Sequence, residues 1–239
     1  MQFQLRSPLS RMQASLYHKK GHVFKNWRQR YHKIRLLMGD IVKIRNIDAI
    51  VTSSNENLVG NKNNSYWRFT GRTNVDGSIR NHSNEEELDR MLKGIKLNQG
   101  DIALTKSTRN IKSNGVKYLI HTIAPDGAYG YDTHISDKIL TQCYSKSLIA
   151  ADDLHCNSIA FPALGCGVKD WPAAKAAVIA YKAISEARLN FIKQVDFIFI
   201  GINTFNTFKA VGDKVFGLKT TSIQTEEGRK IEYPYIGKI

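Results

Sequence analysis

The residues with the clearest potential for chemistry lie at positions 165–172, in a loop between an apolar run and an Ala-rich segment. Gly165 and Gly167 would let the backbone turn tightly and present successive N–H groups, and a helix that begins after the loop would add positive potential. Such a loop can hold a phosphate or a pyrophosphate. Its spacing matches neither GxxxxGK(S/T) nor GxGxxG, and a Gly-x-Gly between a strand and a helix, taken alone, is more often a simple turn.

Two other segments place polar side chains where a ligand could meet them. Asn55 follows the apolar run 47–53, and its amide can cap a turn or hydrogen-bond a ligand hydroxyl. Asp76 precedes Gly77 within residues 75–79, so that a carboxylate stands beside a flexible glycine. As a lone motif, the second pattern predicts an Asx turn in a loop.

Cysteine and histidine do not point to metal or nucleophilic chemistry. Cys143, Cys156 and Cys166 are an odd number without CxxC spacing, which disfavours a disulfide framework or a zinc site and favours a reducing compartment. No histidine is paired in the sequence with Cys166. His121 lies inside the apolar segment 117–123 and is expected to be a satisfied core histidine. We predict no metal and no cofactor.

Apolar runs alternate with helical patterns, and this alternation would position the loops. Strands are predicted over residues 33–41, 47–53, 101–105, 117–123, 158–164 and 195–202. One helix is predicted to begin after Asn84, with Glu87 in a capping box and Gly94 after its end. Others are predicted over residues 135–152, 172–188 and 204–216. Nearly continuous apolar strands must be covered on both faces, which predicts a three-layer α/β/α domain that binds ligands at the carboxyl ends of its strands.

Length and charge limit the class of protein. The 239 residues, 42% of them hydrophobic, suffice for one large domain or at most two small ones, and they exclude general disorder. No apolar run approaches the roughly 20 residues that span a bilayer. The net charge is +14, and nine basic residues precede the first acid, Asp40, which leaves +5 for the other 200 residues.

Residues 1–33 are therefore predicted to form a basic arm or hairpin that attracts nucleic acid or another anionic surface. The first 16 residues also have the acid-free composition of a mitochondrial transit peptide, so we expect an intracellular protein, cytoplasmic or nuclear, with the mitochondrion as the alternative. Residues 60–74 are polar and carry Tyr66, Trp67 and Phe69, which predicts a long surface loop of the kind that often has a function. Residues 219–239 are predicted to form a tail or a hairpin.

From about residue 34 to residue 216 the sequence resembles a macro domain, the ADP-ribose-binding module. The resemblance rests on six segments in order, at residues 39–41, 48–58, 75–79, 100–105, 119–125 and 158–172. It implies the macro-domain fold, with a mixed central sheet, over residues 34–218. It also implies that ADP-ribose or an ADP-ribosylated protein is the partner. A monomer is expected.

The resemblance implies a role for each matching position. Asp40 would accept a hydrogen bond from the adenine amino group, with Ile41 beside it, although Asp40 can also be a turn carboxylate. Asn55 would contact the distal ribose, and Asp76 falls where hydrolase members place an acid that helps to activate water, with Asp170 as the second choice. The other ligand-contacting positions are Gly77, Ser78, Gly165, Cys166, Gly167, Val168, Lys169, Ile202 and Asn203, with Phe205 as a further candidate to pack against adenine.

Departures from the family pattern leave several functions open. Thr52 replaces the first of two usual asparagines, and the insertion at residues 60–74 splits the glycine-rich stretch. Lys169 replaces an aromatic residue, and Asp170 a glycine. The chain is predicted to be an ADP-ribosyl hydrolase, a reader that binds ADP-ribose without cleaving it, or a binder of nucleic acid or anionic surfaces through its arm.

Overall fold

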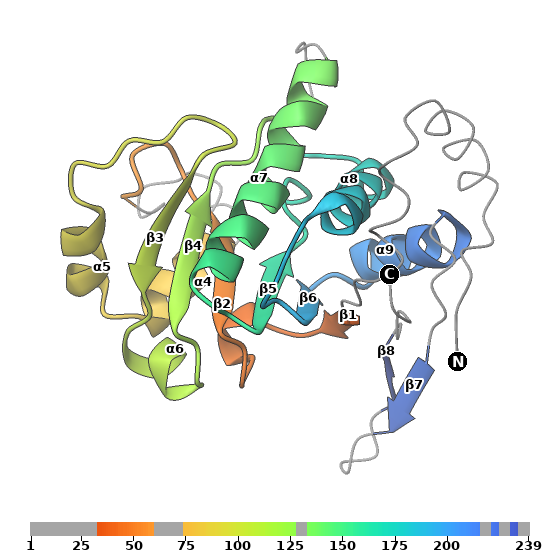
Figure 1. Ribbon diagram of the computed structural model, residues 1–239, viewed down its shortest axis with the longest axis horizontal. Coiled ribbons are helices and arrows are strands. Elements are labelled where there is room, and N and C mark those ends of the chain that lie inside the picture. Colours follow the sequence, from red (N-terminus) through yellow and green to blue (C-terminus); the bar gives the residue numbers. More distant parts are fainter. Residues whose placement is uncertain (1–32, 60–73, 128–132, 216–220, 225–229, 234–239) are drawn as a thin grey trace.

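The computed structural model describes residues 33–59, 74–127, 133–215, 221–224 and 230–233. A six-stranded sheet runs through them in the order β1-β6-β5-β2-β4-β3 (Figure 1). The strands are β1 (Lys33–Met38), β2 (Ala49–Ser53), β3 (Ile102–Lys106), β4 (Tyr118–Thr122), β5 (Ser158–Pro162) and β6 (Gln194–Phe199). Hydrogen-bonded neighbours are parallel except β3, which is antiparallel to β4. The predicted mixed sheet is confirmed.

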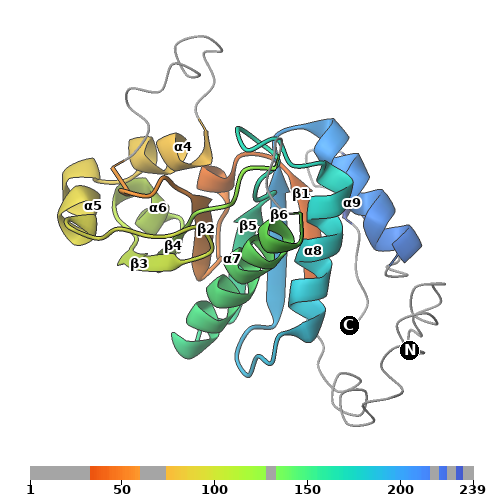
Figure 2. The same cartoon turned by 90° about the horizontal axis from the view of Figure 1, so that it is seen from above.

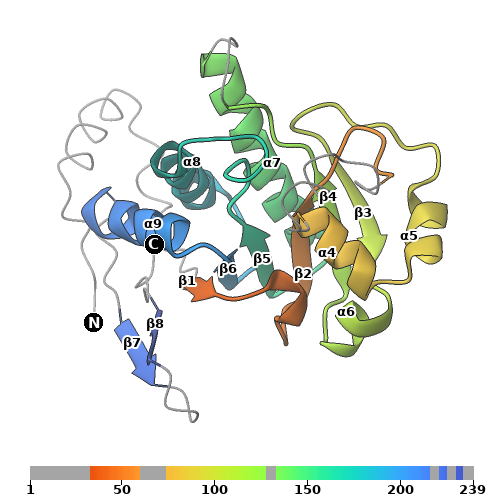
Figure 3. The ribbon, with the colours of Figure 1, turned by 180° about the vertical axis from the view of Figure 1, so that it is seen from behind.

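Helices cover both faces of this sheet, which confirms the three-layer α/β/α fold (Figures 2 and 3). One face packs against α7 (Thr133–Asp153), α8 (Ala173–Glu186) and α9 (Ile202–Val215). The other packs against the 3-10 helix η1 (Ile41–Lys43) and against α4 (Val75–His82), α5 (Glu85–Leu92) and α6 (Arg109–Ser113). Alternation along β2 explains the division, because Val51 joins the first core and Ile50 the second.

Several elements differ from the sequence prediction. The first strand, predicted over residues 33–41, ends at Met38, and Ile41–Lys43 form η1 instead. Residues 75–79 are not a loop: they form the first turns of α4, which Asn74 caps by accepting a hydrogen bond from the Gly77 N–H at 2.8 Å. The strand expected to reach Ile202 ends at Phe199, and Ile202 is the first residue of α9. The short helix α6 was not predicted at all, since it is only five residues long.

The start of α5 shows why local patterns predict some contacts and miss others. Asn84 caps the helix as expected, accepting from the Glu87 N–H at 3.4 Å. The N–H of Asn84 donates to the Thr108 hydroxyl at 2.7 Å instead of to Glu87, so the predicted reciprocal capping box is wrong. Gly94, at φ +79, lies just beyond the end of the helix, where it was expected.

Two further strands, β7 (Thr221–Gln224) and β8 (Lys230–Tyr233), pair antiparallel, and β8 contacts the edge strand β1. Residues 1–32 and 60–73 lie outside the described residues, so the basic arm and the insertion stay predictions. Within the part of the chain that the structure describes, no helix is long and apolar enough to cross a bilayer.

Candidate functional site

The candidate site lies along the edge of the sheet where five parallel strands end. β1, β6, β5, β2 and β4 are neighbours in this order, so the loops that follow them emerge side by side. Asp40, residues 163–171 and Asn55 follow β1, β5 and β2 respectively. Three strand spacings separate β1 from β2, a distance of about 14 Å. The edge therefore presents its polar groups in a line that suits an elongated ligand.

In the middle of this row of polar groups, the loop after β5 presents mainly backbone N–H groups. Three hydrogen bonds close the loop: Cys166 N–H to Ala163 O at 3.1 Å, Asp170 N–H to Gly167 O at 3.0 Å, and Trp171 N–H to Gly165 O at 3.0 Å. Among the described residues, nothing accepts a hydrogen bond from four other N–H groups of the loop, those of Gly165, Gly167, Val168 and Lys169. Successive free N–H groups form an anion-binding nest.

The Trp171 side chain packs against the backbone of this loop. Gly165 has φ +82, a backbone conformation that disfavours any side chain. A Cβ built on it would also lie 2.7 Å from Trp171 Cδ1 and would clash with the indole. The indole Nε1 donates to Pro125 O at 2.8 Å, and the Gly127 N–H donates to Lys169 O at 2.7 Å. The loops after β4 and β5 are thereby joined. Gly167 differs from Gly165, because a Cβ there would meet nothing within 4 Å.

The charged side chains of the loop lie at its surface. Lys169 Nζ is 2.8 Å from Asp126 Oδ1, and both side chains are partly exposed, so this pair contributes little to stability. Asp170 is exposed and has φ +51, a left-handed conformation that glycine adopts more easily. The second-choice catalytic acid therefore extends from the strained end of the loop, with its side chain in solvent.

Cys166 does not have the properties of a nucleophile. Burial of its side chain raises the pKa of the thiol to about 12, and the sulfur faces the Leu164 carbonyl oxygen at 3.9 Å. At neutral pH the side chain is therefore a thiol, whereas the thiolate is the reactive form.

At the β1 end of the edge, Asp40 is partly exposed, and its Oδ1 accepts from the Val42 N–H at 3.2 Å to cap η1. It is thus the turn carboxylate that one interpretation of the sequence expected, and the same bond orients it. Ile41 is buried, so its side chain belongs to the core. Ile202 and Asn203 are exposed at the start of α9. Phe205 is buried against Phe199, with ring centroids 5.7 Å apart.

At the β2 end, Asn55 is partly exposed in a tight turn. Its Oδ1 accepts from the Val59 N–H at 3.3 Å and its backbone oxygen accepts from the Leu58 N–H at 3.0 Å. Ser54 anchors the turn to β4 by donating its N–H to Thr122 O at 2.8 Å. Gly77 and Ser78 lie in the first turn of α4, partly buried, and Gly77 is an ordinary helical residue instead of a flexible one.

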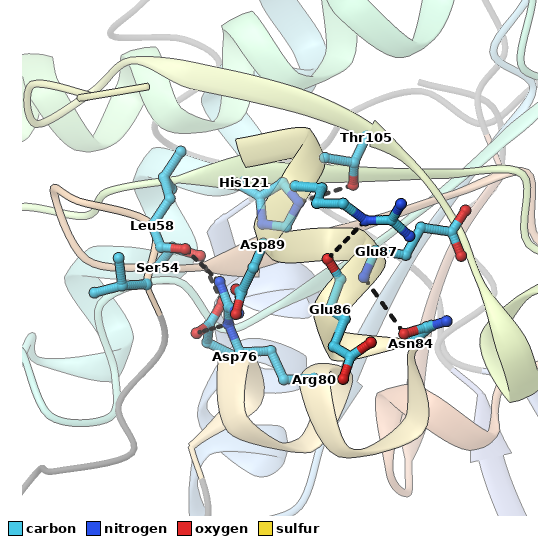
Figure 4. Close-up of polar contacts among 12 residues, drawn as sticks. Ser54, Leu58, Asp76, Arg80, Asn84, Glu86, Glu87, Asp89, Thr105 and His121 are labelled. Carbon is cyan, nitrogen blue, oxygen red and sulfur yellow. Dashed lines mark hydrogen bonds and ion pairs between the residues drawn. The ribbon is translucent and has the colours of Figure 1, made fainter. Parts of the chain in front are cut away.

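Asp76 lies beneath this turn in a group of polar side chains, which we call the Asp76 cluster: the buried Ser54, Asp76 and Arg80, and the half-exposed Asp89 (Figure 4). Asp76 is 1% exposed; its Oδ1 accepts from Ser54 Oγ at 2.6 Å and its Oδ2 from Arg80 Nε at 3.2 Å. Arg80 Nη1 reaches Asp89 Oδ1 at 2.6 Å. Burial raises the pKa of Asp76, and the Ser54 hydrogen bond and the Arg80 charge offset only part of this effect. Asp76 is therefore a desolvated carboxylate with a counter-ion.

His121 and Thr52 lie side by side on the face of the sheet that packs against α4 and α5. His121 is buried as expected, and its Nε2 is 3.0 Å from Thr105 Oγ1. Neither His121 Nδ1 nor Thr52 Oγ1 has a hydrogen-bond partner within the described residues, so the expectation of a fully satisfied histidine is wrong for one nitrogen. Burial and the nearby Arg80 charge lower the pKa of His121 to about 3, which keeps the ring neutral.

The sequence did not single out Arg80, the most connected member of the Asp76 cluster. Arg80 lies four residues after Asp76, the spacing of an ion pair on one helix face. This signal was missed because residues 75–79 were predicted to be a turn. Among the residues that the structure describes, no three His, Cys, Asp or Glu side chains gather as metal ligands would.

Comparison with known proteins gives a consistent result. The family model described as Macro domain matches residues 51–180. A macro domain-containing protein of Caldanaerobacter subterraneus subsp. tengcongensis is 30% identical over 181 residues, which cover 74% of this chain and 93% of that protein. A protein of Escherichia fergusonii named O-acetyl-ADP-ribose deacetylase is 32% identical over 155 residues, covering 64% of this chain and 79% of that protein.

Solved structures agree on the fold. The Oceanobacillus iheyensis macrodomain with ADP superposes with a TM-score of 0.60 at 21% identity, covering 75% of this chain and 89% of that one. The Trypanosoma brucei macrodomain in complex with ADP-ribose also has a TM-score of 0.60, at 23% identity, and the match covers 75% of this chain and 69% of that one.

Proposed function

The chain belongs to the macro-domain family, and from this premise we propose that it binds ADP-ribose and hydrolyses the bond that joins ADP-ribose to a modified protein side chain or to a small acyl or phosphate group. The observation that carries the proposal is the set of four N–H groups, those of Gly165, Gly167, Val168 and Lys169, that have no acceptor among the described residues and lie at the centre of the carboxyl edge. Relatives named O-acetyl-ADP-ribose deacetylase support the hydrolytic part.

The order of the strands supports one direction for the ligand along the edge of the sheet. Adenine would lie at the β1 and β6 end, where the Asp40 carboxylate can accept a hydrogen bond from its amino group, near the exposed Ile202 and Asn203. The two phosphates would accept hydrogen bonds from the backbone of the loop after β5. The distal ribose would then reach Asn55, beside β2. About 14 Å between β1 and β2 matches an extended dinucleotide-like molecule better than a small anion.

Asp76 would act as the general base. A carboxylate whose pKa is raised by burial takes a proton from water more readily than an exposed one. Because Asp76 is almost fully buried, the proton would pass through Ser54, which is 8% exposed and donates its hydroxyl hydrogen to Asp76. Water would give its proton to Ser54 Oγ as the Ser54 hydrogen moves to Asp76, and the hydroxide formed would attack the anomeric carbon or the acyl group.

A reader that binds ADP-ribose without cleaving it is the second candidate, and one observation favours it. Both carboxylate oxygens of Asp76 are already bonded, one to Ser54 and the other to Arg80. A base held in this way contributes to catalysis only if Ser54 relays the proton or if the cluster rearranges. Thr52 is also fully buried, where the family usually has asparagine, so its side chain lies in the core.

Two measurements separate these candidates. Calorimetry with ADP-ribose tests binding, and product assays with O-acetyl-ADP-ribose and with a mono-ADP-ribosylated protein test cleavage. Asp76→Ala should keep the affinity for ADP-ribose and lose turnover by about 10²- to 10⁴-fold, and Ser54→Ala should lose a large part of it. Tight binding by the wild type without any product would identify a reader. Unchanged turnover in Asp76→Ala would reject Asp76 as the base and direct attention to Asp170→Asn.

A role for residues 1–33 in binding nucleic acid or an anionic surface remains a separate proposal, which rests on the acid-free composition of that segment. Deletion of residues 1–32 should then remove binding to nucleic acid, together with its steep dependence on salt, and leave ADP-ribose affinity unchanged. Retained nucleic-acid binding would assign the activity to another part of the chain.

A further inference from the structure

Arg80 is the residue through which two parts of the candidate site are connected. Its side chain is 4% exposed, and its guanidinium donates to three acceptors on three different elements. Nε bonds Asp76 on α4 and Nη1 bonds Asp89 on α5, while Nη2 donates to the backbone oxygen of Leu58 in the turn after β2 (Figure 4). A planar guanidinium can serve acceptors in three directions at once, which an ammonium at the end of a flexible chain does less well.

Leu58 shows why its carbonyl needs to be held. Its φ is +55, a left-handed conformation that is unfavourable for a leucine, and its side chain is buried. Such a conformation persists where its surroundings fix it. The N–H of Leu58 donates to the backbone oxygen of Asn55, and the next N–H, that of Val59, donates to the Asn55 side chain. The conformation of Leu58 therefore sets the position of Asn55.

We propose that Arg80 is a positioning residue that holds the Asn55 turn and the Asp76 carboxylate in a fixed relation to each other. The ligand-contacting roles of Asn55 and Asp76 rest on the proposed function above, whereas the linkage itself is a property of the fold. Arg80 touches the candidate base and the backbone of the candidate ribose-binding turn, and it acts through both.

The charges around Arg80 are consistent with this role. The titratable groups that interact with Arg80 are Asp76 on its own helix, Asp89 on α5 and His121 on β4, and His121 is neutral because burial and the Arg80 charge lower its pKa to about 3. Asp89 is half-exposed, so its charge is partly screened, while Asp76 depends on Arg80 for a counter-ion. Replacing arginine by lysine keeps that counter-ion and removes the three-way geometry, which allows the two effects to be separated.

The test compares Arg80→Lys with Arg90→Lys in the full chain. Arg90 is an exposed arginine on α5 whose side chain, among the described residues, bonds its own helix backbone alone, at Glu86 O (3.4 Å), so the same substitution there is a matched control. We expect Arg80→Lys to raise the Kd for ADP-ribose, and the KM of any substrate that is turned over, by about tenfold. The acidic limb of the kcat profile should stay within a few tenths of a pH unit, because the charge beside Asp76 is retained. Arg90→Lys should leave all three unchanged.

If Arg80 had only a structural role, Arg80→Lys would lower the melting temperature, but it would not raise KM while leaving the acidic limb of the kcat profile unchanged. Equal Kd values for Arg80→Lys, Arg90→Lys and the wild type would overturn the proposal. If Arg80→Lys does not fold, Asp89→Asn replaces it, since that side chain is half-exposed and supplies one of the three acceptors. Asp89→Asn should raise the Kd by roughly two- to fivefold, and an unchanged Kd would again overturn the proposal.

Amide hydrogen exchange distinguishes a failure of this proposal from a failure of the proposed function. If the wild type does not bind ADP-ribose, the proposed function is wrong. The link between Arg80 and the Asn55 turn is then tested by the hydrogen-exchange rates of the Leu58 and Val59 N–H groups alone. Their exchange should be about tenfold faster in Arg80→Lys than in Arg90→Lys if Arg80 holds the turn. Equal exchange rates in the two variants would refute the linkage whatever the ligand is.

Discussion

Substitution of Gly165 by alanine tests whether the loop after β5 is shaped by its own backbone. At φ +82 an alanine is disfavoured by about 1–2 kcal/mol. The added Cβ would also lie 2.7 Å from Cδ1 and 2.9 Å from Cγ of Trp171. The indole cannot move away freely, because it is buried and its Nε1 is bonded to Pro125 O. Overpacking of this kind costs about 1–3 kcal/mol.

The two effects together predict a loss of about 2–5 kcal/mol in the free energy of unfolding, a large part of the ~5–15 kcal/mol that is typical of a domain. For a chain of this length, a loss of about 3 kcal/mol lowers Tm by roughly 6–12 °C. Gly167→Ala is the matched control, because a Cβ there meets nothing within 4 Å. We expect its Tm to equal that of the wild type or to rise slightly, since alanine reduces the entropy of the unfolded chain.

Thermal unfolding with and without ADP-ribose is the appropriate assay. Without ligand, Gly165→Ala should melt well below Gly167→Ala. With ligand, Gly167→Ala should gain less stabilisation than the wild type, since its methyl group would occupy the space in front of the unpaired N–H groups. Equal Tm values for the two unliganded variants would refute the argument that Trp171 shapes the loop. Equal ligand-induced shifts in Gly167→Ala and the wild type would refute the location assigned to the phosphates.

Three further predictions concern buried groups. The folded state keeps His121 neutral down to a pKa of about 3 while the unfolded chain takes up a proton below about 6.5, so stability falls as pH decreases through this window. Denaturant titrations should show a loss of about 2 kcal/mol from this group between pH 7 and pH 5 that His121→Gln lacks, and parallel pH profiles would contradict it. Cys166→Ser should keep both ADP-ribose affinity and turnover within about twofold, since the thiol pKa of about 12 leaves no thiolate at neutral pH. A large loss of turnover would instead indicate that Cys166 acts as a nucleophile. Asp152 is buried and accepts from the N–H groups of Asn190, Phe191 and Ile192, so urea unfolding should show Asp152→Asn less stable by about 1–3 kcal/mol, and equal midpoints would contradict this role.

The sheet and the long helices were predictable because their signals are local and periodic. β5 and β6 consist of apolar residues almost throughout, as strands covered on both faces must, and α8 is rich in alanine. The end of β6 was predicted three residues too late, because Ile200 and Ile202 extend the apolar run although both are exposed. An apolar sequence segment does not show which of its isoleucines are buried and which are exposed at the edge of the sheet.

The environment of Asp76 could not be predicted, because it depends on contacts between distant elements. Gly77 and Asp76 resemble a turn when they are considered alone, and only the cap from Asn74 and the packing of Ile79 against the sheet make the segment helical. Ser54 contacts Asp76 across 22 residues, and the intervening chain includes the insertion. Its position in the family pattern therefore identified Asp76 as a candidate acid, but it did not indicate that the carboxylate is buried and paired.

The ion pairs of the candidate site indicate that the proposed ligand binding does not depend on the net positive charge of the chain. Lys169 in the loop after β5 and Arg80 beside the Asn55 turn are each paired with carboxylates, Lys169 with Asp126 and Arg80 with Asp76 and Asp89. In the proposed mode of binding, the backbone N–H groups of the loop after β5 would therefore hold the diphosphate. A surplus of positive charge is not needed for such binding. Eight of the basic residues lie instead within residues 1–33, which contain no acid, and this local surplus is the basis of the separate proposal that residues 1–33 bind an anionic partner.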